Sequence, residues 1–186
     1  MEHGAEYSVV LTTSSGLFAY YIGDFVRFVS VFPHRIVFAG RASGMLSLTQ
    51  ELMTNFEIET AVAAAANAEP CTLIDFTASS EVDIDGTARG RYVLFAEFER
   101  APKDLPSLAR AFDAGLCQQN RVYREHRAKD VAILPPVVIP LARGATRRFM
   151  EELGQTSVQH KFPRIIDERR RDILRRFAQG ASGQSN

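Results

Sequence analysis

The stretch TNFEIETAVAAAANAEPCTLIDF, residues 54–76, decides the fold, because its apolar period changes from that of a helix to that of a strand. Thr54 and Glu57 form a capping-box pattern, in which each side chain can bind a backbone amide at the start of a helix. Apolar residues follow at helical spacing up to about Asn67, and Pro70 then introduces a β-rich run that ends at Phe76. The stretch predicts a helix followed by a strand.

A hairpin and a second helix are expected after this stretch. The turn-like residues 83–86 precede a β-rich run at 92–98, which predicts a hairpin whose Glu97 and Glu99 point toward solvent. Apolar residues at helical spacing then predict a helix that extends toward Arg127.

Cap residues and prolines limit the remaining elements. Asp104 or Ser107 can cap the second helix, and Asp167 can cap a last one. The run 131–141 is strand-like, but its three prolines keep it at the edge of a sheet or give it an irregular end. A short helix is expected at 145–153.

Upstream of the deciding stretch, four β-rich runs follow one another closely, at 7–11, 17–22, 25–32 and 36–39. From Ile36 the order β-α-β-β-α-β is that of an α+β, split βαβ (ferredoxin-like) sandwich, with extra C-terminal helices. The earlier strands are expected to belong to a larger domain, since the chain offers no helix to cover them. Residues 180–186 are expected to be a disordered tail.

Composition narrows the class of protein. Hydrophobic residues make up 46% and charged residues 24% of the 186, which is the balance of a globular protein. Net charge is zero and no nucleic-acid module is recognisable, so a nucleic-acid partner is not expected. Neither a membrane span nor a signal peptide is evident, and Cys71 and Cys117 have no metal-ligand spacing. We therefore expect a cytoplasmic protein without a metal site.

Four short stretches carry chemistry-bearing residues. They are 16–24 (GLFAYYIGD), 37–41 (VFAGR), 46–51 (LSLTQE) and 158–164 (VQHKFPR). Each has an ordinary interpretation when taken alone: a Gly-Asp pair is most often a turn, and basic residues beside a proline are most often a solvated loop. Their order and spacing are more specific than any one of them.

Together these stretches resemble the Gretchen Hagen family of auxin-responsive acyl-acid amido synthetases, within the acyl-adenylate-forming superfamily. Residues 12–17, followed by Tyr20 and Gly23-Asp24, are similar to its third nucleotide-binding motif. Residues 156–164 are similar to its C-terminal basic motif. The resemblance extends from about Tyr7 to Ile173.

The resemblance implies a two-domain, ATP-dependent ligase. In the family, a large N-terminal domain binds ATP and a carboxylic acid, and a small C-terminal domain pivots about a hinge. The acid is adenylated, with Mg as the usual counter-ion of ATP, and the acyl group then passes to an amino acid. Residues 1–35 would be the end of the large domain and the hinge, and 36–179 the small domain. The phosphate-loop motifs would precede Met1, so this chain alone is expected to be inactive.

The resemblance also implies roles for individual residues. Asp24 matches the family's ribose-binding aspartate, and a carboxylate suits a diol because it can accept two hydrogen bonds. Tyr20 and Gly23 belong to the same nucleotide motif, and Arg41 would reach the nucleotide just past the hinge. Lys161 matches the lysine that stabilises the α-phosphoryl transition state. Arg164, at the end of the same basic motif, is expected to contact the nucleotide as well.

Three positions depart from the family pattern. The family usually has arginines where this chain has Ala19 and Tyr21, and often a lysine at Leu52. The loss of these cations predicts fewer phosphate contacts.

A non-catalytic α+β module that binds a protein partner or a small ligand is the alternative. The reading frame separates the two: several hundred preceding residues with a Ser/Thr-rich phosphate loop favour the ligase, and a true start at Met1 favours the module.

Overall fold

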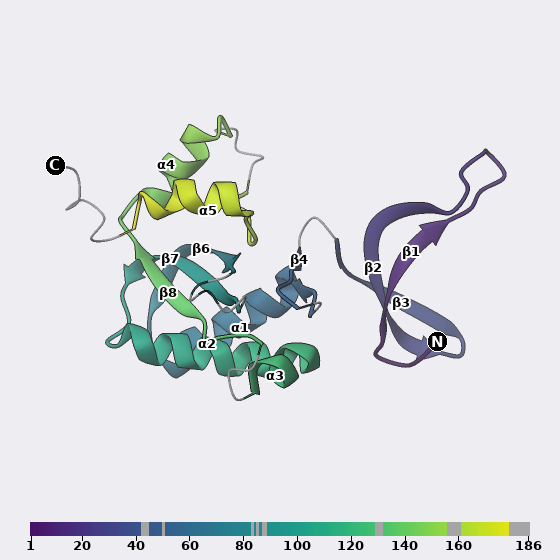
Figure 1. Ribbon diagram of the computed structural model, residues 1–186, viewed down its shortest axis with the longest axis horizontal. Coiled ribbons are helices and arrows are strands. Elements are labelled where there is room, and N and C mark those ends of the chain that lie inside the picture. The colour runs from purple at the N-terminus through teal and green to yellow at the C-terminus, as the bar shows by residue number, and fades with distance from the viewer. Residues whose placement is uncertain are drawn as a thin grey trace. The chain divides into compact units, whose positions relative to one another are not determined.

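The computed structural model describes residues 1–41, 45–49, 51–82, 84, 86, 89–128, 132–155 and 161–178 (Figure 1). The chain divides into two compact units. Unit 1 comprises Met1–Met45 with Thr54–Phe56, and unit 2 comprises Leu46–Met53 with Glu57–Asn186. The mixture of sheets and helices confirms the predicted α+β class. The tail predicted at 180–186 lies outside the described residues.

Unit 1 is a three-stranded antiparallel sheet in the order β1-β2-β3. Its strands are β1 (Glu6–Leu11), β2 (Tyr20–Val31) and β3 (His34–Arg41). The prediction of two strands separated at Gly23-Asp24 is wrong, because β2 runs through both residues. Phe28 is the buried apolar residue of this sheet, and it packs against Tyr7 and His34 with ring centroids 5.4 and 6.0 Å away.

Strand β3 belongs to this sheet, which corrects the predicted order of strands. It was expected to begin the helix-covered sandwich, but it pairs with β2 from Val31↔His34 to Asp24↔Arg41. Only two residues connect β2 and β3, so antiparallel pairing of neighbours closes a short loop at little entropic cost. Among the described residues, the helix-covered sheet therefore has three strands and not the predicted four.

Unit 2 has a three-stranded sheet covered by helices on both faces (Figure 1). Strands β6 (Thr72–Glu81) and β7 (Arg91–Arg100) are antiparallel, and β8 (Val137–Leu141) pairs in parallel with β7. One face carries α1 (Asn55–Ala68), α2 (Leu105–Gln119) and α3 (Arg121–Arg127), and the other carries α4 (Ala145–Glu152) and α5 (Glu168–Arg175). The short strands β4 (Met45–Leu46) and β5 (Met53–Thr54) pair with each other.

The central strand β7 supplies both cores. Its Tyr92 and Leu94 belong to the apolar cluster beneath α1 and α2, and its Val93 and Phe95 belong to the cluster beneath α4 and α5. Successive residues of a strand point to opposite faces, so an unbroken apolar run fits a strand that is buried on both sides. Strand β8 lies at the edge, as its prolines predicted, with Pro140 opposite Ala96.

Several predicted helix ends are confirmed. Asp104 accepts a hydrogen bond from the Ser107 amide at 3.0 Å, and Asp167 accepts one from the Arg170 amide at 2.9 Å. The helix expected to reach Arg127 is instead divided at Asn120, whose extended backbone ends α2 and whose side chain caps α3. None of the helices in the described part of the chain has the length and apolar composition of a membrane span.

Glu97 is buried, which corrects its predicted orientation toward solvent. Only 2% of it is exposed. Its carboxylate accepts hydrogen bonds from the Gly144 amide at 2.6 Å, the Thr146 amide at 2.9 Å and the Thr146 hydroxyl at 2.8 Å. The parallel register places Leu141 opposite Glu97, so the start of α4 passes beside it. A helix start offers unpaired amides, and a carboxylate satisfies them well.

The local environment lowers the pKa of Glu97. Burial alone would raise this pKa, but the hydrogen bonds from Thr146 and Gly144 and the charge of Arg148 outweigh it. A group whose pKa is lower in the folded state stabilises the fold above its unfolded pKa and loses that contribution as the pH falls through its folded pKa.

We expect Glu97→Gln to lower the free energy of unfolding by about 1–3 kcal/mol at pH 7, because an amide cannot accept from all three donors. The difference from the wild type should shrink as the pH falls below about 4.3, where an unperturbed glutamate protonates. Urea unfolding followed by circular dichroism at several pH values measures this. Glu99→Gln, on the exposed part of the same strand, is the control. A difference that stays constant down to pH 3 would contradict the assignment.

Candidate functional site

The connection between β1 and β2 is a closed turn built from its own polar groups. The Thr13 amide donates to the Leu17 carbonyl at 2.9 Å, and the Ala19 amide donates to the Thr12 hydroxyl at 3.1 Å. Gly16 has φ +105°, a conformation that favours glycine. The Ser/Thr-rich start of the nucleotide-like motif therefore forms an ordered turn directly before Tyr20.

An irregular β-bulge interrupts the pairing of β1 with β2 at Gly23. Ser8 pairs with Phe25 and Val10 pairs with Tyr21, so residues 22–24 of β2 lie opposite Val9 alone. Gly23 has φ +78°, which a residue with a side chain adopts only with strain. Bulges commonly reorient side chains near functional sites, and Asp24 directly follows Gly23 in this bulge.

Four of the predicted site residues lie on this sheet. Tyr20 begins β2 opposite Leu11 and is half exposed, and Gly23 and Asp24 form the bulge. On the other side of β2, the register places Arg41 opposite Asp24. The sheet thus places the backbones of Asp24 and Arg41, an acidic and a basic candidate, directly opposite each other on neighbouring strands.

Lys161 and Arg164 lie in unit 2. Lys161 is exposed, and residues 156–160 before it lie outside the described residues. Arg164 is partly buried, and its guanidinium binds acceptors within unit 2. The structure therefore groups the predicted residues in two sets, four in unit 1 and two in unit 2.

Leu52 occupies an unusual backbone conformation. Its φ is +47°, and Ala19, another position that departs from the family pattern, has the same value. Leu52 is exposed, so the cation that is absent here would have projected from a surface position.

The residue before it, Glu51, ends the LSLTQE stretch and is a buried charged residue. It is 3% exposed, and its carboxylate accepts from the amides of Leu48 at 2.6 Å and Thr49 at 2.7 Å and from the Tyr92 hydroxyl. Thr49 also contacts His126, with 2.6 Å between its hydroxyl and Nδ1. These bonds fasten the first residues of unit 2 to its core.

Asn120 strengthens the same attachment. Its amide donates to the Glu51 carbonyl at 2.8 Å and to the Glu57 carboxylate at 3.3 Å. Burial, followed by the charge of Glu51, raises the pKa of Tyr92 well above its usual range, so Tyr92 stays a hydroxyl donor to that carboxylate. Sequence reasoning missed this network because its members lie far apart along the chain.

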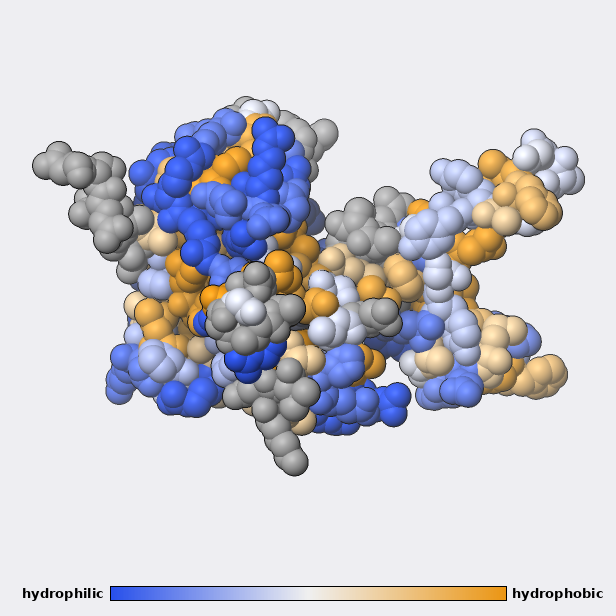
Figure 2. All heavy atoms as spheres, viewed as in Figure 1, coloured by the Kyte–Doolittle hydropathy of each residue, from blue (hydrophilic) through white to orange (hydrophobic). Residues whose placement is uncertain are grey.

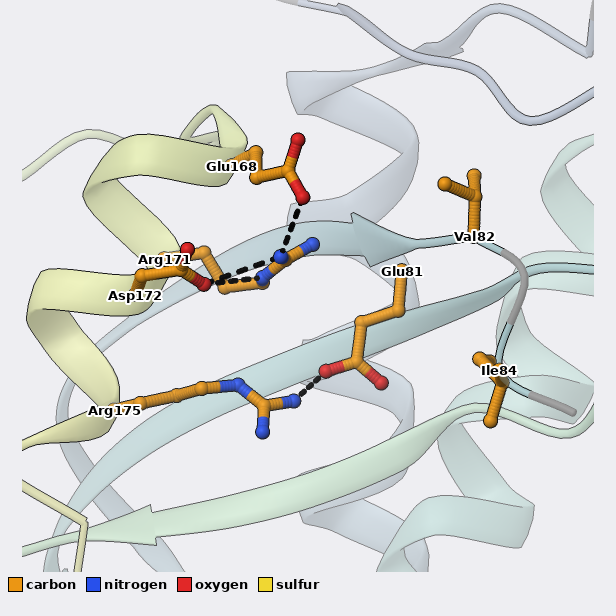
Figure 3. Close-up of a pocket in the computed structure, with 7 residues that line it drawn as sticks. All are labelled: Glu81, Val82, Ile84, Glu168, Arg171, Asp172 and Arg175. Carbon is orange, nitrogen blue, oxygen red and sulfur yellow. Dashed lines mark hydrogen bonds and ion pairs between the residues drawn. The ribbon is translucent and has the colours of Figure 1, made fainter.

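A pocket of about 340 Å³ lies between the end of β6 and α5 (Figure 3). It is lined by Glu81, Val82, Ile84, Glu168, Arg171, Asp172 and Arg175. Its charges are paired with one another, since Arg175 binds Glu81, and Arg171 binds Glu168 at 3.0 Å and Asp172 at 3.1 Å. Figure 2 shows hydrophilic residues gathered over α4 and α5. None of the predicted site residues lines this pocket.

Among the residues that the structure describes, no three His, Cys, Asp or Glu side chains are placed to hold a metal ion.

Two family models match the chain in succession. The model of the GH3 family central domain matches residues 1–41, and that of the GH3 family C-terminal domain matches residues 56–170. The first match ends with β3, and the second begins in the first turn of α1.

Similar proteins point to the same family as the two family models. A probable indole-3-acetic acid-amido synthetase of Oryza sativa subsp. japonica is 32% identical over 88% of this chain and 28% of its own length. A jasmonoyl–L-amino acid synthetase of the same plant is 30% identical over 94% of this chain and 31% of its own. The solved structure of GH3.15 acyl acid amido synthetase has a TM-score of 0.67 and 25% identity over 95% of this chain. The chain spans 28% and 31% of the lengths of these two synthetases and 33% of the solved chain.

We expect Gly23→Val to loosen the pairing of β1 with β2. A Cβ at Gly23 would meet only a Tyr21 ring atom at 3.9 Å, so the cost is conformational, about 1–2 kcal/mol for a left-handed residue. Hydrogen exchange of the β1 and β2 amides should then be about 5 to 30 times faster. Gly23→Asn is the matched control, because asparagine tolerates this conformation better and should show a smaller effect. Unchanged exchange in the valine variant would show that the bulge does not need glycine.

Proposed function

Because the chain belongs to the GH3, or Gretchen Hagen, family, we propose that it is the C-terminal part of an ATP-dependent acyl-acid amido synthetase. The observation that carries the proposal is the succession of the two family models, central domain first and C-terminal domain second, over most of the chain. The acid and the amino acid would bind mainly to a preceding domain, since the relatives are more than three times as long.

The reaction we propose has two steps. A carboxylate oxygen of the acid attacks the α-phosphorus of ATP, the bond to the β-phosphate oxygen breaks, and pyrophosphate leaves. The amine nitrogen of an amino acid then attacks the acyl carbon, AMP leaves, and the amine loses a proton. Two relatives are named for indole-3-acetic acid and for a jasmonoyl product, so these acids are the first candidates to test.

Unit 1 would supply contacts to the nucleoside. Asp24 would accept hydrogen bonds from the two ribose hydroxyls, and the bulge at Gly23 would aim it. Tyr20, half exposed at the start of β2, would offer a ring face or a hydroxyl to the nucleotide. Arg41, opposite Asp24 in the register, would supply a positive charge.

Unit 2 would supply Lys161. Its exposed ammonium would stabilise the negative charge that develops on the α-phosphoryl group. A Mg ion would accompany ATP as its counter-ion and share in neutralising the phosphates. A rotation of unit 2 that delivers Lys161 would couple binding to the exclusion of water.

The exposed apolar residues of unit 1 support a preceding domain. Phe18, Phe32 and Phe38 are 86%, 93% and 66% exposed, and solvent-exposed aromatic side chains at such density are costly unless a partner covers them. We place the end of the large domain after Arg41, because β3 pairs with β2 and the central-domain model ends at the same residue.

We expect this chain alone to show no ATP–pyrophosphate exchange, because it lacks the phosphate-binding motifs of the large domain. A longer protein that contains the chain should catalyse exchange when a suitable carboxylic acid is present. Exchange of radioactive pyrophosphate into ATP measures both. Turnover by the chain alone would contradict the division of the site, and a reading frame that truly starts at Met1 would favour a binding module.

In the longer protein we expect two distinct defects. Asp24→Ala should raise the KM for ATP about tenfold, because a lost charge-assisted hydrogen bond costs about 1.5–3 kcal/mol. Lys161→Ala should lower kcat about 100-fold or more, as expected for a group that stabilises transition-state charge. Lys103→Ala, at another exposed lysine, is the control. Unchanged kinetics in both variants would remove the assignment of these residues.

A further inference from the structure

We propose that Arg164 is a positioning residue that fastens the segment bearing Lys161 to the edge of the unit 2 sheet, instead of binding the nucleotide itself. The role assigned to Lys161 rests on the proposed function, whereas the attachment stands on contacts within unit 2.

The guanidinium of Arg164 bridges two elements of unit 2. Its Nε donates to Glu59 of α1 at 3.0 Å. Its Nη1 donates to Asp75 of β6 and to the Phe76 carbonyl, the latter at 3.0 Å. The same group lies 4.4 Å from the centroid of the Phe76 ring, a cation–π arrangement.

The charges around Arg164 argue against a phosphate contact. Two carboxylates, Glu59 and Asp75, face one guanidinium, so the local balance is already negative. Burial would lower the pKa of Arg164, but the bonds to Asp75 and Glu59 raise it above its usual value, and the group stays charged. A phosphate would have to displace acceptors that already satisfy this cation.

The backbone on either side of the guanidinium is attached as well. The Ala78 amide donates to the Arg164 carbonyl at 2.9 Å, and the Ile166 amide donates to the Ala78 carbonyl at 3.0 Å. The Ser79 hydroxyl donates to the Ile166 carbonyl at 2.9 Å. Residues 164–166 thus run in parallel beside β6 and extend the sheet by a short edge segment.

Lys161 is close to this attachment along the chain. Phe162 packs edge-on against Phe149 with centroids 5.8 Å apart, and Pro163 has a fixed φ. Only these two residues separate Lys161 from Arg164. The Cα of Lys161 therefore stays within about 10 Å of the Cα of Arg164. Arg164 would therefore act on the chemistry by limiting where the Lys161 ammonium can go.

Hydrogen exchange on this chain tests the attachment without any activity. In Arg164→Gln, the amides of Ala78 and Ile166 should exchange at least tenfold faster than in the wild type, and the Ala142 amide, bonded to Phe177, serves as an internal reference. Asp75→Asn should produce the same change in the same two amides. Arg176→Gln, which breaks a surface ion pair with Glu152, is the matched control and should leave them unchanged. Wild-type exchange of both amides in Arg164→Gln would overturn the proposal.

Kinetics of the longer ligase test the route through Lys161. Arg164→Gln should lower kcat for ATP–pyrophosphate exchange about tenfold and change the KM for ATP less than about twofold, with partial rescue in Arg164→Lys. In a Lys161→Ala background, Arg164→Gln should cause no further loss. A raised KM with unchanged kcat, or an equal loss in both backgrounds, would overturn the proposal. If the wild-type ligase shows no exchange, the proposed function fails, and hydrogen exchange alone still decides whether Arg164 anchors the segment.

Discussion

The buried carboxylate of Glu51 is the contact on which the beginning of unit 2 depends. The carboxylate accepts hydrogen bonds from two amides of its own loop and from the Tyr92 hydroxyl. The side-chain amide of Asn120 donates to the backbone carbonyl of Glu51. A loop that enters a core brings polar groups away from water, and each needs a partner. Glu51 meets this need within Leu46–Met53, the first segment of unit 2 along the chain. These bonds therefore hold the first residues of unit 2 in a defined position.

The same use of carboxylates recurs at the other loops of unit 2. Glu97 fixes the start of α4, and Asp75 with Glu59 holds Arg164 beside β6. The sheet and its two apolar cores supply the bulk of the stability, and these acidic groups determine where the connecting segments lie. Unit 1 contrasts with this arrangement, because its strands carry exposed aromatic residues and little core of their own. The difference supports the proposal that unit 1 is the end of a larger domain.

Local patterns in the sequence predicted much of this fold. The caps at Asp104 and Asp167, the hairpin and the edge position of the proline-rich strand each depend on neighbouring residues, which periodicity and side-chain chemistry report directly. Three features could not be obtained in this way. The pairing of β3 with β2, the burial of Glu97 and the bulge at Gly23 depend on which segments meet in space. A glutamate at an alternating position predicts exposure unless a distant helix start covers it, as α4 does here.

The candidate site, too, could be predicted from the sequence only in part. Tyr20, Gly23, Asp24, Arg41 and Lys161 came from the resemblance of short motifs, and the structure adds the bulge and the register that relate four of them. Arg164 was grouped with them by sequence, yet its side-chain partners are Asp75, Glu59 and the Phe76 carbonyl.

Calorimetric titration of the longer protein with AMP tests the central claim most directly. The account predicts saturable binding that Asp24→Ala weakens about tenfold and Lys103→Ala leaves intact. Absence of binding to a folded wild-type protein, or equal binding by the Asp24→Ala variant, would contradict a nucleotide site on the β2–β3 sheet.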